Sequence, residues 1–189
     1  MKRLNRKGVT LIELLVALVI CGIVAGGIYQ VFIAQSKAYS VQDQVTEVQQ
    51  TVRSAMEILL RDLRMAGYDN DSPLSAITIT APIANLSDSA ITVIYEYQNQ
   101  KHTIAYWRDA GSSSLIRKLT VNDVASPQET LLENVENLTF TYGVDADEDG
   151  ALDSWVAAGS VGMSKVVAVR VALTARPVQI NPDLQKISP

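Results

Sequence analysis

Four aspartates near the C-terminal end of the chain have the spacing of a calcium-binding loop. They occupy positions 1, 3, 5 and 9 of residues 145–153, with a glycine at position 6: Asp145, Asp147, Asp149, Asp153 and Gly150. Side chains so spaced can converge on one centre while the glycine permits a sharp turn, and carboxylate oxygens are ligands that Ca²⁺ prefers. The carbonyl oxygen of Ala151 would add a further ligand. The sequence therefore predicts a Ca²⁺ site in this loop.

The predicted calcium loop departs from an EF-hand at its end. Position 12 is Val156 instead of a bidentate glutamate, and the loop follows a predicted strand instead of a helix. Another acid or a water would have to close the site, so we expect a modest affinity, about 10⁻⁴–10⁻³ M as in extracellular calcium modules. A solvated acidic turn between two strands is the alternative interpretation.

Another carboxylate, Glu13, stands at the entrance of a long apolar run. Residues 14–36 carry no charged side chain, and these 23 residues are enough to cross about 30 Å of hydrocarbon as a helix. Segment 1–8 contains four basic residues, which predicts that the N-terminus stays in the cytoplasm. A carboxylate at the bilayer centre costs roughly 2.5–3.5 kcal/mol, so Glu13 needs a partner or a purpose that a plain anchor does not supply.

The segment GVTLIELLVA at residues 8–17 resembles the prepilin-type N-terminal motif of type IV pilins and type II secretion pseudopilins. The resemblance implies that a prepilin peptidase cuts after Gly8 and that the new N-terminus at Val9, where the family usually has Phe, is methylated. Glu13 then becomes the fifth residue of the mature chain. The new amine could pair with Glu13 of the same chain or of a neighbouring subunit, which would set the axial register of a filament.

The same N-terminal segment has other interpretations. One is a plain uncleaved anchor. A secretory signal cleaved near residues 25–27 would fit the small residues there, but the apolar run continues to Ile33. A lipoprotein signal at Cys21 is disfavoured because the preceding Ile20 is large.

The N-terminal third predicts one continuous helix from Thr10 to Ala66, with Gly67 as its C-cap. Beyond the apolar run, apolar residues recur every three or four positions: Val41, Val45, Val48, Val52, Ala55, Leu59 and Leu63. Such a one-sided stripe needs a globular partner. The glycines at positions 22, 26 and 27 would permit close approach of another helix.

The rest of the chain predicts short strands without intervening helices. They cover residues 76–80, 90–98, 102–107, 115–121, 135–142 and 165–175, and the second and third are expected to form a hairpin. The predicted fold class is α+β, a long N-terminal helix packed on one C-terminal antiparallel β-sheet, as in pilins. The expected organisation is a cleaved leader (1–8), a transmembrane and filament-core helix (9–36), an amphipathic helix (37–67) and a β-sheet globular domain (68–189).

Two downstream segments, Leu60–Tyr68 and Glu133–Asp145, resemble PilW-like minor pilins, and the related J-type type II secretion pseudopilins are the alternative. The resemblance implies a low-abundance subunit that helps to initiate or cap pilus assembly. The implied partners are the prepilin peptidase, other minor and major pilins and the inner-membrane assembly platform. The implied location is the bacterial inner membrane, crossed once with the globular domain in the periplasm, and later the pilus at the cell surface.

An enzyme is not expected, because the chain has one histidine, His102, and one cysteine, Cys21. Most metal, thiol and triad mechanisms therefore lack parts. The net charge is −4, and without residues 1–8 there are 12 basic and 20 acidic residues, a net charge of −8, which argues against nucleic acid as a partner. The alternative from another class is a DNA-binding pilin that uses a basic cluster: Arg108, Arg117 and Lys118.

Overall fold

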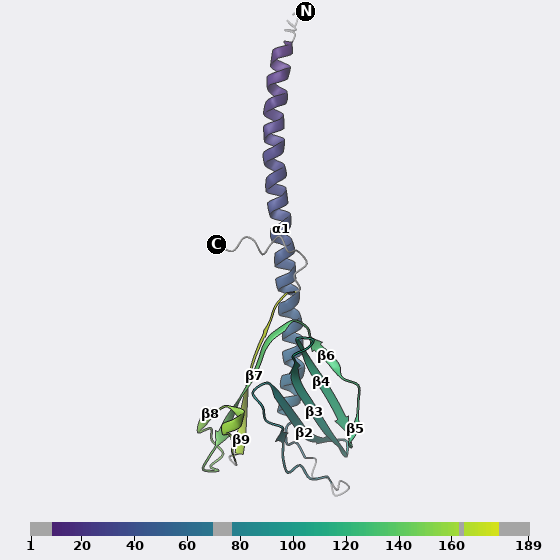
Figure 1. The fold of residues 1–189 in the computed structure, drawn as a ribbon, viewed down its shortest axis with the longest axis vertical. Coiled ribbons are helices and arrows are strands. Elements are labelled where there is room, and N and C mark those ends of the chain that lie inside the picture. The colour runs from purple at the N-terminus through teal and green to yellow at the C-terminus, as the bar shows by residue number, and fades with distance from the viewer. Residues whose placement is uncertain (1–8, 70–76, 163–164, 178–189) are drawn as a thin grey trace, which may run out of the picture. The chain divides into compact units, whose positions relative to one another are not determined.

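The computed structural model describes residues 9–69, 77–162 and 165–177 of the chain (Figure 1). The predicted leader 1–8 lies outside the described residues. The chain divides into two compact units, Met1–Val45 and Thr46–Pro189. Helix α1 runs from Leu11 to Arg64, so its first part belongs to the first unit and its last part to the second.

The first unit consists of the apolar part of α1. Every described side chain from residue 9 to residue 43 is exposed, including the large apolar ones. The most apolar 18-residue window of the helix has a mean hydropathy of 2.6, and by length and composition the helix could span a membrane. A helix that is apolar on all sides needs an apolar environment or other helices around it.

The helix ends two residues earlier than predicted. Backbone hydrogen bonds join the segment that follows it to Ile94 and Glu96. Residues 65–67 form a turn, and Gly67 has a φ of 75°, the left-handed conformation that glycine adopts most easily. The Gly67 N–H donates a hydrogen bond to the Ile94 carbonyl at 2.9 Å, and the Tyr68 carbonyl accepts one from the Glu96 N–H at 2.8 Å.

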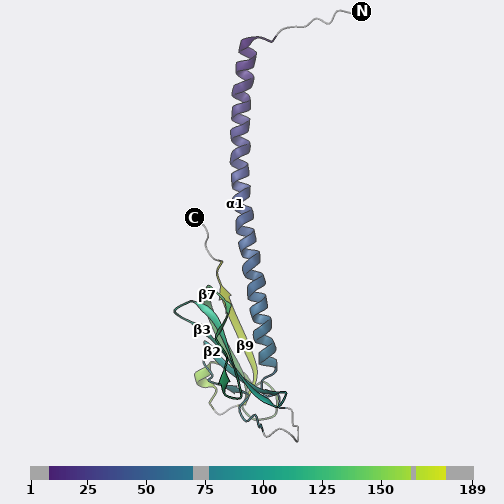
Figure 2. The same ribbon diagram turned by 90° about the vertical axis from the view of Figure 1, so that its right-hand side faces the viewer.

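The second unit contains two antiparallel sheets in place of the single sheet predicted (Figures 1 and 2). The six-stranded sheet has the order β1-β2-β3-β4-β5, with β6 also paired to β4: β1 (Ile83–Ala84), β2 (Ala90–Tyr97), β3 (Gln100–Asp109), β4 (Ser114–Val121), β5 (Val124–Ala125) and β6 (Glu129–Leu132). The three-stranded sheet has the order β8-β7-β9: β8 (Ser154–Val156), β7 (Val135–Asp145) and β9 (Lys165–Ala175). A short 3₁₀ helix, Ala158–Ser160, follows β8.

The predicted α+β class is confirmed, and several strands agree with their predicted ranges. The hairpin forms between β2 and β3, with Gln98 and Asn99 at positive φ in its turn. Strand β9 has the predicted bounds. The apolar alternation of β7 is imperfect because its register against β9 shifts between Val135 and Asn137. The predicted strand 76–80 is wrong for the described residues 77–80, which are not in a strand, while Ala76 lies outside the described residues.

One core joins the last part of α1 to both sheets. It contains Ala55 and Leu59 from the helix, Ile104 from β3, and Phe140 and Tyr142 from β7, each 2% exposed or less. The second half of the predicted helical stripe, Val52 to Leu63, therefore packs in this core, whereas Val41 and Val45 are 40% and 41% exposed. Hydrophobic burial is the main force that holds this part of the helix.

A buried carboxylate interrupts this apolar stripe. Asp62 lies three residues after Leu59, and its side chain is 4% exposed. Its Oδ2 accepts a hydrogen bond from the Tyr106 hydroxyl at 2.6 Å and from Arg117 Nε at 3.0 Å, and Arg117 Nη2 lies 3.0 Å away. Burial, together with the hydrogen bond to Asp62, raises the pKa of Tyr106. The cluster of Asp62, Tyr106 and Arg117 fixes the helix on β3 and β4.

Removal of the Asp62 carboxylate should destabilise the second unit. Asp62→Ala leaves Arg117 buried without its main partner, so we expect the free energy of unfolding to fall by about 3–5 kcal/mol. Urea unfolding followed by tryptophan fluorescence measures this. The control is Arg53→Ala, because the Arg53–Glu57 pair is exposed (82% and 67%) and should contribute little. An Asp62→Ala effect no larger than that of the control would contradict the anchoring role.

The unit should also lose stability in alkali. The Tyr142 hydroxyl donates to the Ser87 carbonyl at 2.8 Å, and burial raises the pKa of Tyr142 from 10.0 to about 12. A folded-state pKa above the unfolded value means that the stabilisation is complete below about pH 10 and is lost as the pH rises through 12. The measurement is the urea midpoint from pH 8 upward. Tyr142→Phe should show a shallower decline, and a flat profile in the parent chain would refute the prediction.

Candidate functional site

Glu13 and Thr10 form a capping box at the start of helix α1. Oε2 of Glu13 accepts hydrogen bonds from the Thr10 N–H and from the Thr10 hydroxyl, both at 2.8 Å, and the Glu13 N–H lies 3.4 Å from Thr10 Oγ1. Thr10 and Glu13 thereby satisfy backbone donors at the helix start. This capping role was not predicted from the sequence, although the Thr-x-x-Glu spacing is its signature.

The residues of the predicted processing site lie beside this capping box. Val9 is described, directly precedes Thr10 and is 69% exposed, whereas Gly8 lies outside the described residues. Within the described part of the chain, Oε1 of Glu13 receives no hydrogen bond, since both bonds from Thr10 go to Oε2. One carboxylate oxygen is thus used to start the helix and the other is left for a further partner.

The acidic loop 145–153 connects β7 to β8 in the three-stranded sheet. Its base is closed by the Asp153 N–H, which donates to the Val144 carbonyl at 3.0 Å, and by the Ala146 N–H, which donates to Asp153 Oδ2 at 2.7 Å. Gly150 has a φ of 87°, as the sharp turn predicted at this position requires. The pairing of Val144 with Ser154 holds the two ends of the loop together.

Three of the four predicted loop aspartates lie together. Asp145, Asp147 and Asp149 each offer a carboxylate oxygen, and these oxygens lie within 4.8 Å of one another. Asp153 is not in this group, because its carboxylate is at the base of the loop. The Ala151 N–H donates to Asp149 Oδ1 at 2.7 Å, which places Ala151 next to the group.

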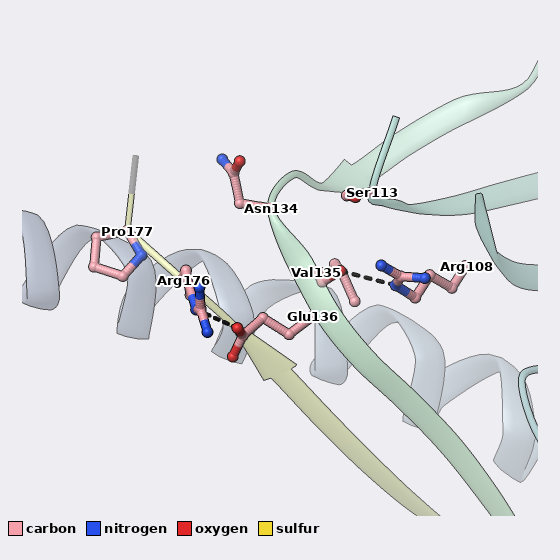
Figure 3. A pocket seen from close by; sticks show the side chains of 7 residues that line it. All are labelled: Arg108, Ser113, Asn134, Val135, Glu136, Arg176 and Pro177. Atoms are coloured by element: carbon pink, nitrogen blue, oxygen red, sulfur yellow. Dashed lines mark hydrogen bonds and ion pairs between the residues drawn. The ribbon is translucent and has the colours of Figure 1, made fainter. Parts of the chain in front are cut away.

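The basic residues considered for DNA binding do not form an exposed patch. Arg117 is bound to Asp62, and the Arg108 Nε donates to the Val135 carbonyl at 2.8 Å. Arg108 lines a pocket of about 590 Å³ in which Arg176 pairs with Glu136 (Figure 3). Of the three residues in the predicted cluster, only Arg117 forms an ion pair among the described residues, and Lys118 has neither an ion pair nor a side-chain hydrogen bond there.

The ring of His102 is packed against an aromatic side chain of the neighbouring strand. Its ring stacks on Tyr95 with centroids 5.2 Å apart, and its Nε2 is buried without a hydrogen-bond partner among the described residues. Burial lowers the pKa of His102 below its ordinary value, which favours the neutral ring. A stacked ring in a strand, with burial favouring its neutral form, fits a role in packing.

Two family models match the chain, and their ranges do not overlap. The prokaryotic N-terminal methylation motif matches residues 3–29, which include Gly8, Val9 and Glu13. The type IV pilus-assembly protein W model, PilW, matches residues 100–188, which include the acidic loop and the strands from β3 onward. The Leu60–Tyr68 segment lies in neither range. No curated protein and no solved structure matches the chain.

The long apolar helix, the antiparallel sheets and the methylation motif together define a type IV pilin-like protein. The second match makes the similarity more specific: the C-terminal part of the chain is similar to PilW, which supports a PilW-like type IV pilin. The matches point to a structural subunit of a pilus and not to an enzyme.

Proposed function

We propose that this chain is a minor type IV pilus subunit that is inserted in the inner membrane, processed there and assembled into the pilus, where it helps to initiate or cap assembly. The observation that carries the proposal is the position of Glu13, a carboxylate at the start of a 54-residue helix whose first part exposes apolar side chains on all sides. The methylation motif and the PilW match support it.

The exposed apolar helix suits both locations in this proposal. In the membrane its side chains contact lipid, and in a filament they contact the helices of neighbouring subunits. A Cβ atom on Gly22, Gly26 or Gly27 would meet nothing within 4 Å in the described chain, so these positions leave room for close approach of another helix. The basic leader keeps the N-terminus in the cytoplasm, which places the globular unit in the periplasm.

Processing would give the capping box a second role. Cleavage after Gly8 leaves a methylated ammonium at Val9, one residue before Thr10. In a medium of low dielectric constant this cation and the Glu13 carboxylate attract strongly, and each relieves the burial of the other. Because Thr10 uses Oε2, Oε1 can accept from the ammonium of an incoming subunit, which would fix its axial position.

The pilus is favoured over a type II secretion pseudopilus because the PilW model matches the C-terminal part of the chain, whereas the N-terminal motif resembles both classes. The expected partners are the prepilin peptidase, other minor and major pilins and the inner-membrane assembly platform. Nucleic acid is not an expected partner, because Arg108 and Arg117 are engaged within the fold.

Processing predicts a defined mature N-terminus. The protein purified from its host should begin at Val9 and carry one methyl group, because the motif around the cleavage site is intact. Intact mass and N-terminal peptide mass spectrometry measure this. Gly8→Leu should accumulate with the full leader, since a bulky side chain would occupy the place of the small residue at the cut. A host-derived chain starting at Met1 or near Ile28 would be incompatible with the proposal.

Assembly should depend on the charge of Glu13 beyond its capping role. Gln can replace Glu in a capping box, so Glu13→Gln retains the bonds from Thr10 but removes the charge, while Glu13→Val removes both. We expect both variants to insert in the membrane at normal levels and to be depleted from sheared filaments. Thr10→Ala weakens the cap by about 1 kcal/mol and keeps the charge, so it should still assemble. Normal assembly of Glu13→Gln would show that capping alone explains the carboxylate.

A further inference from the structure

Outside the proposed assembly motif, the end of β7 carries a buried carboxylate, Asp145, that lacks a partner for one of its oxygens among the described residues. Asp145 is 1% exposed, and its Oδ2 accepts a hydrogen bond from the Gly150 N–H at 2.9 Å. Its Oδ1 is also buried but has no hydrogen-bond partner among the described residues. A buried carboxylate oxygen without a partner is costly, because it has lost its water and gained nothing in exchange.

The neighbouring loop carboxylates add negative charge near Asp145, and Lys165, its partner across β7 and β9, forms no ion pair with it among the described residues. Oxygens of Asp147 and Asp149 lie within 4.8 Å of an oxygen of Asp145. No arginine or lysine of the described residues forms an ion pair with any of the three carboxylates. Three carboxylates at this separation repel one another, and the repulsion is least screened at the buried one. A bound cation would remove both the repulsion and the unpartnered oxygen.

We propose that residues 145–153 bind one Ca²⁺ ion through Asp145, Asp147 and Asp149. Oxygens bound to one calcium at 2.3–2.6 Å can be no more than about 5 Å apart, and the three oxygens meet this limit. An all-oxygen set of carboxylates without imposed octahedral geometry suits calcium better than magnesium, which requires near-ideal octahedral geometry. The Ala151 carbonyl and water complete the coordination, while Asp153, which the sequence spacing also predicted as a ligand, closes the base of the loop.

The loop holds the two exposed aspartates through bonds that leave ligand oxygens free. The Asp149 N–H lies 3.4 Å from Asp147 Oδ1, and the Ala151 N–H donates to Asp149 Oδ1 at 2.7 Å. In both residues the second carboxylate oxygen is not used by these bonds. Leu152 then anchors the loop on the sheet, because Gly143 has no side chain: a Cβ there would lie 2.6 Å from Leu152 Cδ1.

The test uses the full-length protein, purified in detergent and freed of metal with a chelator. Calorimetric titration with calcium at constant ionic strength should give one ion per chain with a Kd of about 10⁻⁴–10⁻³ M. Trp155 lies in β8 directly after the loop, so its emission should change in the same titration. A Trp107→Phe background isolates this signal. Neither readout depends on pilus assembly, so failure here leaves the proposed function standing.

Variants separate coordination from a general charge effect. Asp147→Asn and Asp149→Asn keep the acceptor oxygens that shape the loop but remove a charged ligand, and each should weaken calcium binding about tenfold or more. Glu148→Gln removes the same charge from the same loop at a residue outside the group of three, so its affinity should change little. Absence of both heat and an emission change well above millimolar calcium would overturn the site. An equal loss in Glu148→Gln, or equal affinity for magnesium, would overturn it as well.

Discussion

The bond between the Asp62 carboxylate and the side chains of Tyr106 and Arg117 determines where the end of the helix lies on the six-stranded sheet. Hydrophobic packing of Ala55 and Leu59 supplies most of the driving force, but it is not directional and would tolerate a shift of the helix along its axis. A buried carboxylate allows no such shift, because its oxygens must meet specific donors. The later contacts follow from this placement: the turn at Gly67 then meets Ile94, and Tyr68 meets Glu96, both on β2.

The need of carboxylate oxygens for specific partners also applies to Glu13 and Asp145, with a different outcome from that at Asp62. Asp62 finds all its partners inside its own unit, so its role is structural. Glu13 has one oxygen bound by Thr10 and one oxygen without a partner in the described chain, which fits a residue whose second partner comes with assembly. Asp145 has one oxygen bound by Gly150 and the other buried and unpartnered. Among the described residues no side chain donates a hydrogen bond to this oxygen, and the proposed Ca²⁺ ion would satisfy it.

The sequence predicted the elements better than their arrangement. Apolar spacing located the helix, the hairpin and β9, since these patterns depend on local alternation. It did not separate the two sheets, because antiparallel strands show the same alternation whichever neighbour they pair with. The short strands β5, β6 and β8 are two to four residues long, too short to show a period. Residues 77–80 alternate but remain outside the sheets, and the first strand is instead the two-residue β1.

For the site residues, the sequence indicated which side chains could meet but not which of them would be buried. The spacing of the loop aspartates indicated which side chains could meet, and three of the four do lie together. Spacing could not show that Asp145 would be buried, because that depends on β7 being the central strand between β8 and β9. Asp62 was missed for the opposite reason. It stands seven residues after Ala55 on the apolar stripe, which was a readable signal, but a single acid next to two arginines in sequence resembles an ordinary solvated helix end.

The acidic loop has consequences for the strand that follows it. Strand β8 is three residues long and pairs with β7 alone, so its position depends on the loop at its start and on side-chain contacts. Its side-chain contacts include the packing of Val156 against the core and the Trp155 ring, with the Arg170 guanidinium 4.2 Å from its centroid. Trp155 and Leu152 are 37% and 44% exposed, which leaves an apolar surface beside the carboxylates. Repulsion within the loop acts directly on this weakly held edge. A cation that removes the repulsion would therefore stabilise the loop, β8 and this surface together.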